Sequence, residues 1–192
     1  MYSYAVEQAI KAATVLHDGQ VRKGTIPVPY VSHLVAVAFI VADYTKDENA
    51  VVAALLHDTL EDTDYTKDEL VEDFGEIVAD IVCTVTEPRG AGVSYKDYKA
   101  AYVTQLKTAS QAALIVAAAD KIHNLRTTIE QYHDHWDQFV NDFGNTLAER
   151  NIFLQNVSNS INARLKNDIV HEFNHVFTEY KSLIAHGEKN KP

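Results

Sequence analysis

Apolar side chains recur at spacings of three and four residues along most of this chain, and the strict alternation typical of β-strands is nearly absent. This periodicity predicts helices over residues 3–18, 32–44, 47–59, 76–86, 95–106 and 110–132. A capping box at Thr66-Lys67-Asp68-Glu69 predicts a further short helix that ends before Gly75. We therefore expect an all-α fold.

The last quarter of the chain carries a second apolar stripe with helical spacing. Its members are Leu154, Val157, Ile161, Leu165, Ile169, Phe173, Val176, Phe177, Tyr180 and Ile184. The stripe predicts one or two amphipathic helices, broken near residues 166–168, that pack on the rest of the molecule. Because the 192 residues are 46% hydrophobic and show no repeat or linker, we expect residues 1–192 to form a single domain.

Composition and charge narrow the class of protein. The only cysteine, Cys83, cannot form an internal disulfide, which fits a reducing compartment. Residues 1–7 do not resemble a signal peptide and no apolar run is long enough to span a membrane, so we expect a soluble cytoplasmic protein. A net charge of −10 argues against general nucleic-acid binding. It still allows a small anionic substrate, because a metal ion and a few bases can reverse the field inside one cleft.

Two apolar segments each end in side chains that bind metals. Residues 51–56 are almost wholly aliphatic, and a histidine and three acids follow directly: His57, Asp58, Glu61 and Asp62. Residues 112–119 carry no polar side chain and lead into Asp120. Carboxylates are rarely buried unless they are paired or bind a cation, so a divalent ion held between the two segments would explain both.

The spacing within the first segment indicates how such a site would work. His57 and Glu61 are four residues apart, as are Asp58 and Asp62, so each pair would share a face if the helix continued. One pair could hold the ion while the next turn placed carboxylates near its coordinated water. This arrangement predicts a metallohydrolase.

A mixed nitrogen and oxygen site needs one more ligand, and His33 is the best candidate. Together with His57, Asp58 and Asp120 it would form a site of two nitrogens and two oxygens. Such a donor set suits one Mn²⁺, Fe²⁺ or Zn²⁺ ion and leaves positions open for water and substrate.

These segments resemble the HD superfamily of metal-dependent phosphohydrolases, and within it the hydrolase domain of RelA/SpoT-type enzymes and of stand-alone small alarmone hydrolases such as metazoan SpoT homologues. The likeness covers roughly residues 4–130. It is carried, in order, by His17-Asp18-Gly19-Gln20-Val21-Arg22-Lys23-Gly24, Pro29-Tyr30-Val31-Ser32-His33, Ala53 to Thr63, Phe74-Gly75, Val85-Thr86, and Ala119 to Arg126. The resemblance implies an all-α HD fold for this motif region, and the C-terminal apolar stripe predicts that helices over residues 134–187 pack on it.

The resemblance also implies a role for each matching residue. The ion, typically Mn²⁺, would be bound by His33, His57, Asp58 and Asp120. Glu61 and Asp62 match the acids that activate the water or protonate the leaving group. The substrate contacts implied are Arg22 and Lys23 along the nucleotide, Asn124 near the ribose and, on a looser alignment, Lys99 at the phosphates.

The implied reaction is removal of the 3′-pyrophosphate of (p)ppGpp, which yields GDP or GTP and pyrophosphate. A nucleotidase or an NADPH phosphatase would use the same metal site, and a non-catalytic module would bind a nucleotide as a sensor. The intact Glu61-Asp62 pair argues against the sensor. The chain departs from the family at His33-Leu34, where His-Pro is usual, and Phe153 is a guess for the aromatic residue over the base or sugar. No synthetase domain is expected, and the oligomeric state is left open.

A competing motif lies near the C-terminus. His171-Glu172-Phe173-Asn174-His175 matches the H-E-x-x-H pattern of zinc peptidases, in which two histidines one helical turn apart flank a glutamate. Such enzymes take a third ligand from further along the chain, where few residues remain. Phe173 also belongs to the apolar stripe, so we expect His171 and His175 to lie on the surface or to serve packing.

Overall fold

The computed structural model describes residues 3–189, and no strand occurs among them. The helices, in chain order, are α1 (Tyr4–Leu16), α2 (Val31–Tyr44), α3 (Glu48–Leu56), α4 (Thr59–Asp62), α5 (Lys67–Phe74), α6 (Glu76–Val85), α7 (Tyr95–Leu106), α8 (Gln111–Tyr132), α9 (Trp136–Phe143), the 3₁₀ turn η1 (Gly144–Thr146), α10 (Leu147–Arg164) and α11 (Ile169–Lys189). An isolated antiparallel bridge joins Val21 to Pro29 in the loop between α1 and α2. The predicted all-α class is confirmed.

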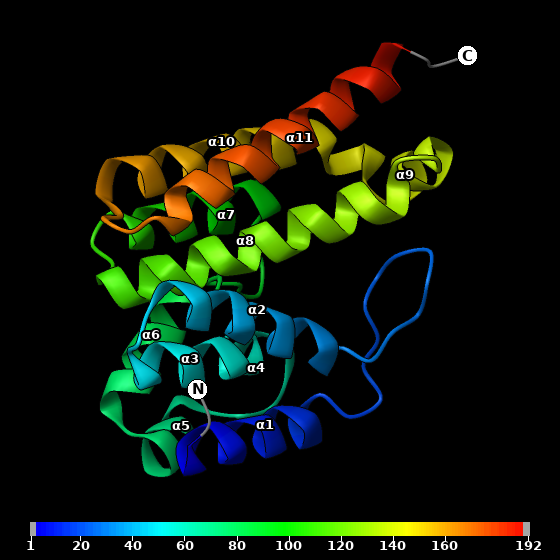
Figure 1. Ribbon diagram of the computed structural model, residues 1–192. Helices are drawn as coiled ribbons and strands as arrows, with labels where there is room; N and C mark the ends of the chain where they lie inside the picture. Colours follow the sequence, from blue (N-terminus) through cyan, green and yellow to red (C-terminus); the bar gives the residue numbers. More distant parts are fainter. Residues whose placement is uncertain (1–2, 190–192) are drawn as a thin grey trace.

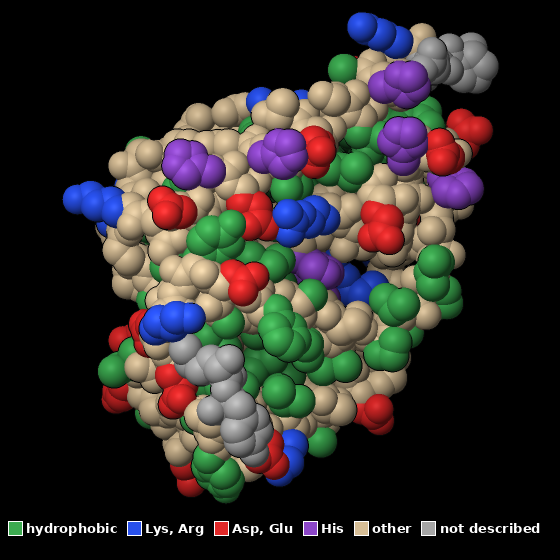
Figure 2. All heavy atoms as spheres, in the orientation of Figure 1, with side chains coloured by type: hydrophobic (Ala, Val, Ile, Leu, Met, Phe, Trp, Pro, Cys, Tyr) green, Lys and Arg blue, Asp and Glu red, His purple; other side chains and the backbone are tan. Residues whose placement is uncertain are grey.

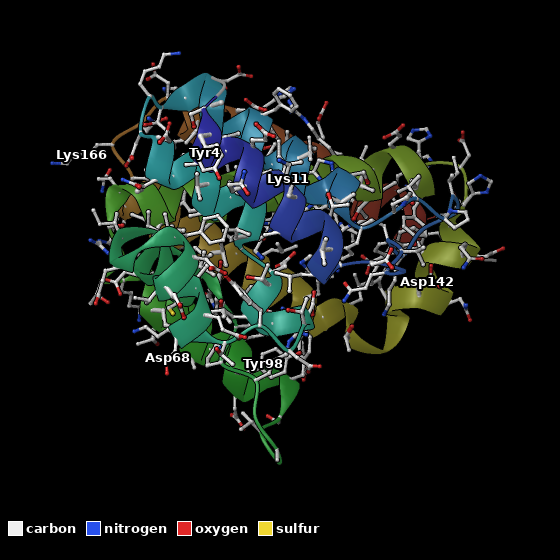
Figure 3. The ribbon with its side chains drawn as sticks, turned by 90° about the horizontal axis from the view of Figure 1, so that it is seen from below. Tyr4, Lys11, Asp68, Tyr98, Asp142 and Lys166 are labelled. Carbon is white, nitrogen blue, oxygen red and sulfur yellow. The ribbon has the colours of Figure 1, made fainter. Side chains whose placement is uncertain are left out.

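Helix α8 occupies the centre of the molecule (Figure 1). Helices α2, α3 and α6 pack against one side of it, and α11 packs against the other. Helix α1 covers α3, and Figure 3 shows Tyr4 and Lys11 on the outward face of α1. Because neighbours surround α8, every residue from Ala113 to Asp120 is buried, which explains why this segment is apolar on all sides before Asp120.

The helix predicted over residues 47–59 ends earlier than the apolar pattern suggested. Helix α3 ends at Leu56, and α4 begins at Thr59. Side chains satisfy carbonyl groups near the break: His57 Nδ1 lies 2.8 Å from the Ala54 oxygen, and the Thr59 hydroxyl donates to the Leu56 oxygen at 2.7 Å. These bonds replace main-chain bonds that a continuous helix would form, so His57 and Asp58 lie at a corner of the chain.

Other local predictions agree with the structure. The capping box is present, with Thr66 and Glu69 each bonded to the backbone of the other. The C-terminal stripe is buried on α10 and α11, which are separated by the predicted break near residues 166–168. Helix α9 precedes them, so the segment after Trp136 contains one more helix than the stripe alone indicated. The buried apolar residues of the described chain form one continuous core.

Between residues 3 and 189, the helices that are long enough to cross a membrane are too polar to do so.

Candidate metal centre

Four predicted ligands meet beside the corner between α3 and α4. His33 comes from α2, His57 and Asp58 from the corner itself, and Asp120 from α8. His57 Nε2 lies 3.2 Å from Asp58 Oδ2, and His33 Nε2 lies 3.3 Å from Asp120 Oδ1. The two crosswise distances, from His33 to Asp58 and from His57 to Asp120, are both 3.6 Å. Three segments of the sequence thus place four ligand atoms around one point.

The imidazoles of His33 and His57 each have a buried nitrogen without a hydrogen-bond partner, as expected at a binding site. The Nε2 atoms of His33 and His57 are buried and have no hydrogen-bond partner. A buried polar atom without a partner is unfavourable unless something else binds it. The ligand atoms of His33, His57 and Asp58 lie within 4.8 Å of one another, and Asp120 adds a second carboxylate. This donor set fits a divalent metal ion.

A second layer of residues orients the four side chains. The Tyr30 hydroxyl donates to Asp58 Oδ2 at 2.7 Å, and Asn124 Nδ2 donates to Asp120 Oδ1 at 2.5 Å. The Lys121 ammonium lies 2.7 Å from Asp120 Oδ2. Burial acts to raise the pKa of Asp120, but Lys121 and the two histidines hold that pKa well below its usual range. Asp120 is therefore a carboxylate, the form that binds a cation.

The acids Glu61 and Asp62 lie beside the four ligands. Glu61 Oε2 accepts a hydrogen bond from the Glu87 backbone at 2.9 Å, and Glu61 Oε1 is paired with Arg89. Asp62 Oδ1 lies 3.5 Å from Arg89, and its Oδ2 accepts from Tyr30 at 3.3 Å. Burial, and then repulsion from Glu87, raises the pKa of Glu61 to about 7 despite the opposing effect of Arg89. Glu61 is thus poised to exchange a proton near neutral pH.

A cleft of about 470 Å³ opens over the ligands Asp58 and Asp120 and over the two acids. Its basic lining consists of Arg22, Lys23, Arg89, Lys99, Lys121 and Arg150. Its aromatic lining consists of Tyr30, Tyr95, Tyr132, Phe143 and Phe153. The cleft therefore combines cationic groups with flat apolar surfaces, in a chain whose net charge is −10.

The residues predicted to contact substrate all line this cleft. Arg22 donates to Asn124 Oδ1 at 2.5 Å, and Lys23 is exposed at the rim. Lys99 is not a solvated surface lysine: its side chain is 16% exposed, pairs with Glu87 and lies 4.4 Å from the centroid of the Phe153 ring. Phe153 therefore lies among the cleft residues, as the guess required.

Several cleft residues were missed by the sequence reasoning. They are Tyr30, Glu87, Arg89, Lys121 and Arg150, and the sequence also did not assign a role to His123, which contacts His33. Tyr30, Lys121 and His123 lie inside motif segments, where proximity to a predicted ligand was the available signal. Glu87 and Arg89 follow α6 in an irregular loop, and Arg150 lies on α10, where no periodicity relates a residue to the ligands.

The competing H-E-x-x-H motif forms no metal site among the described residues. The His175 side chain is 72% exposed and lies 3.5 Å from Glu179, one turn further along α11. Glu172 is bound by Arg126 and by the Tyr44 hydroxyl, so it joins α11 to α8 and α2. Figure 2 shows histidines spread along the face that carries α11, without a shared centre. These histidines belong to the surface, as the apolar stripe indicated.

Comparison with known proteins places this geometry in a family. The model of the HD domain matches residues 9–143. Over 117 residues the chain is 38% identical to the guanosine-3′,5′-bis(diphosphate) 3′-pyrophosphohydrolase of Haemophilus influenzae, a match that covers 58% of this chain and 17% of that protein. Over 126 residues it is 35% identical to a GTP pyrophosphokinase of Streptomyces coelicolor, covering 64% of this chain and 14% of that protein. The chain thus spans less than a fifth of the length of these two relatives.

A solved structure of a metazoan SpoT orthologue that hydrolyses ppGpp has the same fold. The TM-score is 0.74 at 23% sequence identity, and the match covers 93% of this chain and 97% of that one. The family match includes all four ligand positions and both acids. The chain therefore belongs to the HD domain family.

Proposed function

We propose that this chain is a metal-dependent phosphohydrolase that removes the 3′-pyrophosphate of (p)ppGpp. The observation that carries the proposal is the pair of buried, unpartnered Nε2 atoms of His33 and His57, which face Asp58 and Asp120 at the base of a cationic cleft. The hydrolase names among the matched relatives, and the metal chemistry typical of the HD domain, support this reading.

His33, His57, Asp58 and Asp120 would hold the ion, for which we propose Mn²⁺, with Fe²⁺ or Zn²⁺ as alternatives. When bound, a divalent ion supplies a Lewis acid for the phosphoryl group and a nucleophilic water at neutral pH. Tyr30, Asn124 and Lys121 would keep the two carboxylates oriented toward it.

Glu61 and Asp62 would handle the protons of the reaction. Water gives up one proton and forms a bond to the phosphorus attached to the 3′ oxygen, the bond between that phosphorus and the 3′ oxygen breaks, and the leaving 3′ oxygen gains a proton. Because its pKa is about 7, Glu61 is present in both protonation states near neutral pH and can accept or deliver a proton. Arg89, paired with Glu61 and close to Asp62, would hold the two acids in place.

The remaining cleft residues would bind the nucleotide. Arg22 and Lys23 would lie along it, Asn124 would meet the ribose, and Lys99 would neutralise phosphate charge. Phe153, beside the Lys99 ammonium, offers a flat surface for the base or sugar. A small phosphorylated nucleotide is the substrate class that this combination fits.

The experiment that tests the proposal is release of pyrophosphate from ppGpp by purified protein in the presence of Mn²⁺. We expect release with the ion, and its loss both with EDTA and in Asp58→Ala. Failure of a folded, Mn²⁺-loaded protein to release pyrophosphate would exclude the alarmone reaction. Release of phosphate from a nucleoside monophosphate or NADPH under the same conditions would then identify another HD phosphatase.

A further inference from the structure

We propose that His123 is a positioning residue for the ligand His33. In this proposal His123 Nδ1 accepts a hydrogen bond from His33 Nδ1, which leaves His33 Nε2 unprotonated and directed at the metal ion. The inference rests on the metal site of the proposed function, and it gives a role to a residue that the sequence motifs left unassigned.

The contact between the two rings is close and direct. His33 Nδ1 lies 2.8 Å from His123 Nδ1, and the ring centroids are 4.8 Å apart with an interplanar angle of 50°. At this separation one nitrogen carries the hydrogen and the other accepts it, because two facing N–H groups would repel each other. The contact therefore couples the tautomers of the two histidines.

The position of the hydrogen decides whether His33 can bind a cation. Neutral imidazole carries one hydrogen, on Nδ1 or on Nε2. A hydrogen on Nε2 would point at the space between Asp58 and Asp120, where the ion would lie. A hydrogen on Nδ1, donated to His123, leaves the Nε2 lone pair directed at that space. Only the second arrangement makes His33 a ligand.

For the other histidine ligand, His57, a backbone carbonyl group determines which ring nitrogen carries the hydrogen. His57 Nδ1 lies 2.8 Å from the Ala54 carbonyl oxygen. A carbonyl oxygen can only accept, so His57 must carry its hydrogen on Nδ1 and present Nε2 to the ion. The two ligands thus use equivalent bonds, but the acceptor for His33 is a side chain that mutation can replace.

Helix geometry places His123 for this role. It lies three residues after Asp120 on α8, on the same side of the helix, and it is partly buried. One turn of α8 thus supplies both a carboxylate ligand and the acceptor for a histidine ligand from α2.

Two substitutions separate hydrogen bonding from packing. His123→Phe keeps a ring but removes the acceptor, whereas His123→Asn keeps an acceptor close to the position of Nδ1. We expect His123→Phe to weaken Mn²⁺ binding, measured by titration calorimetry, by about 10–100-fold. We expect His123→Asn to retain most of the wild-type affinity. Replacement of His133, an exposed histidine just beyond α8, by Phe is the matched control and should leave the affinity unchanged.

A spectroscopic measurement reads the tautomer itself. In protein loaded with diamagnetic Zn²⁺, long-range ¹H–¹⁵N spectra of the histidines should show a hydrogen on His33 Nδ1 that exchanges slowly with water. The signal should remain in His123→Asn and should exchange fast in His123→Phe. Thermal unfolding of the metal-free variants shows whether any loss of affinity arises from loss of the fold.

The outcomes separate this inference from the proposed function. Equal Mn²⁺ affinity in wild type and His123→Phe overturns the role of His123 and leaves the metal site standing. Equal losses in the Phe and Asn variants, with unchanged metal-free stability, also overturn it. A His33 Nδ1 without hydrogen in Zn²⁺-loaded wild type overturns it whatever the variants do. A wild-type protein that binds no divalent ion overturns both proposals.

Discussion

Arg22 donates a hydrogen bond to Asn124 Oδ1 at 2.5 Å, although the two residues are 102 positions apart in the chain. The same Asn124 amide donates through Nδ2 to Asp120 Oδ1, again at 2.5 Å. Oδ1 is the Asp120 oxygen nearest both His33 Nε2 and His57 Nε2. One amide therefore connects a proposed nucleotide-binding base to a proposed metal ligand.

This connection predicts a double effect for Asn124→Ala. Arg22 loses its anchor and Asp120 loses a donor, so we expect a higher KM for the nucleotide together with about 10–100-fold weaker Mn²⁺ binding. Steady-state kinetics and calorimetry measure the two effects separately. Asn174→Ala is the matched control, because Asn174 exchanges hydrogen bonds with Asn162 on the surface. A change in KM with unaltered metal affinity would contradict the connection to Asp120.

Alanine substitutions at Asp58 and His175 distinguish the four-ligand cluster from the H-E-x-x-H motif. Asp58→Ala removes a half-buried carboxylate from the four-ligand cluster, and we expect it to lower metal affinity by more than the roughly 100-fold that loss of a hydrogen-bond partner of a ligand causes. His175→Ala removes an exposed side chain and should leave metal binding and turnover unchanged. Loss of turnover through His175→Ala alone would overturn the assignment of the site. Calorimetry with Mn²⁺ provides a measurement independent of substrate.

Removal of the Tyr30 hydroxyl should weaken metal binding or turnover more than removal of the hydroxyl of a tyrosine outside the cleft. It donates to Asp58 Oδ2 at 2.7 Å and to Asp62 Oδ2 at 3.3 Å, so Tyr30→Phe loosens a ligand and an acid together. We expect about a 10–100-fold loss in metal affinity or turnover. Tyr65→Phe is the control, since its hydroxyl also donates to an aspartate, Asp73, at 2.7 Å but lies outside the cleft. Equal behaviour of the two variants would show that Tyr30 does not orient Asp58.

Because the pKa of Glu61 is raised in the folded protein, we expect the free energy of unfolding to depend on pH. Its pKa is raised from 4.5 to about 7, so between these values the folded protein holds a proton that the unfolded chain has lost. The free energy of unfolding therefore falls as pH rises through this window. Glu61→Gln has no such proton to lose, so its stability relative to wild type should increase across the window, by up to about 3 kcal/mol.

Urea unfolding in EDTA at several pH values measures this difference. Glu72→Gln, at an exposed position of α5, is the control and should follow wild type at every pH. A constant difference in stability between wild type and Glu61→Gln from pH 4.5 to pH 8 would mean that Glu61 ionises as an ordinary surface carboxyl.

We expect Gly187→Ala to destabilise the protein, although alanine normally stabilises a helix. An added Cβ at this position in α11 would lie 2.1 Å from Trp136 Cε3. Alanine gains about 1 kcal/mol over glycine from helix propensity, but overpacking costs about 1–3 kcal/mol. We therefore expect Gly187→Ala to lower the midpoint of thermal unfolding. An unchanged or higher midpoint would mean that α9 shifts away from α11 at little cost.

The helices could be predicted from the sequence because apolar residues three and four positions apart mark the buried face of each helix. Helix α7 begins at Tyr95 and ends at Leu106, as its periodicity indicated. The corner after Leu56 was missed because side-chain bonds from His57 and Thr59 end α3 while the apolar pattern continues. Hydrophobic periodicity contains no information about such bonds.

The four proposed ligands were chosen by chemistry and resemblance, and the structure brings them together. The supporting contacts could not be predicted in the same way. Glu87, for example, is paired with Lys99 and donates its backbone N–H to Glu61, and it comes from a loop without periodicity. Contacts of this kind depend on how helices from distant parts of the chain meet, which a single sequence does not encode locally.

The two walls of the cleft come from different parts of the chain. The proposed ligands and acids belong to α2, the corner between α3 and α4, α4 itself and α8, whereas Phe143, Arg150 and Phe153 belong to α9 and α10. Under the proposed function, the residues of the chemical step and part of the nucleotide-contacting surface thus come from separate helices. We therefore expect substitutions at Phe143, Arg150 and Phe153 to change the preferred substrate more than they change metal affinity.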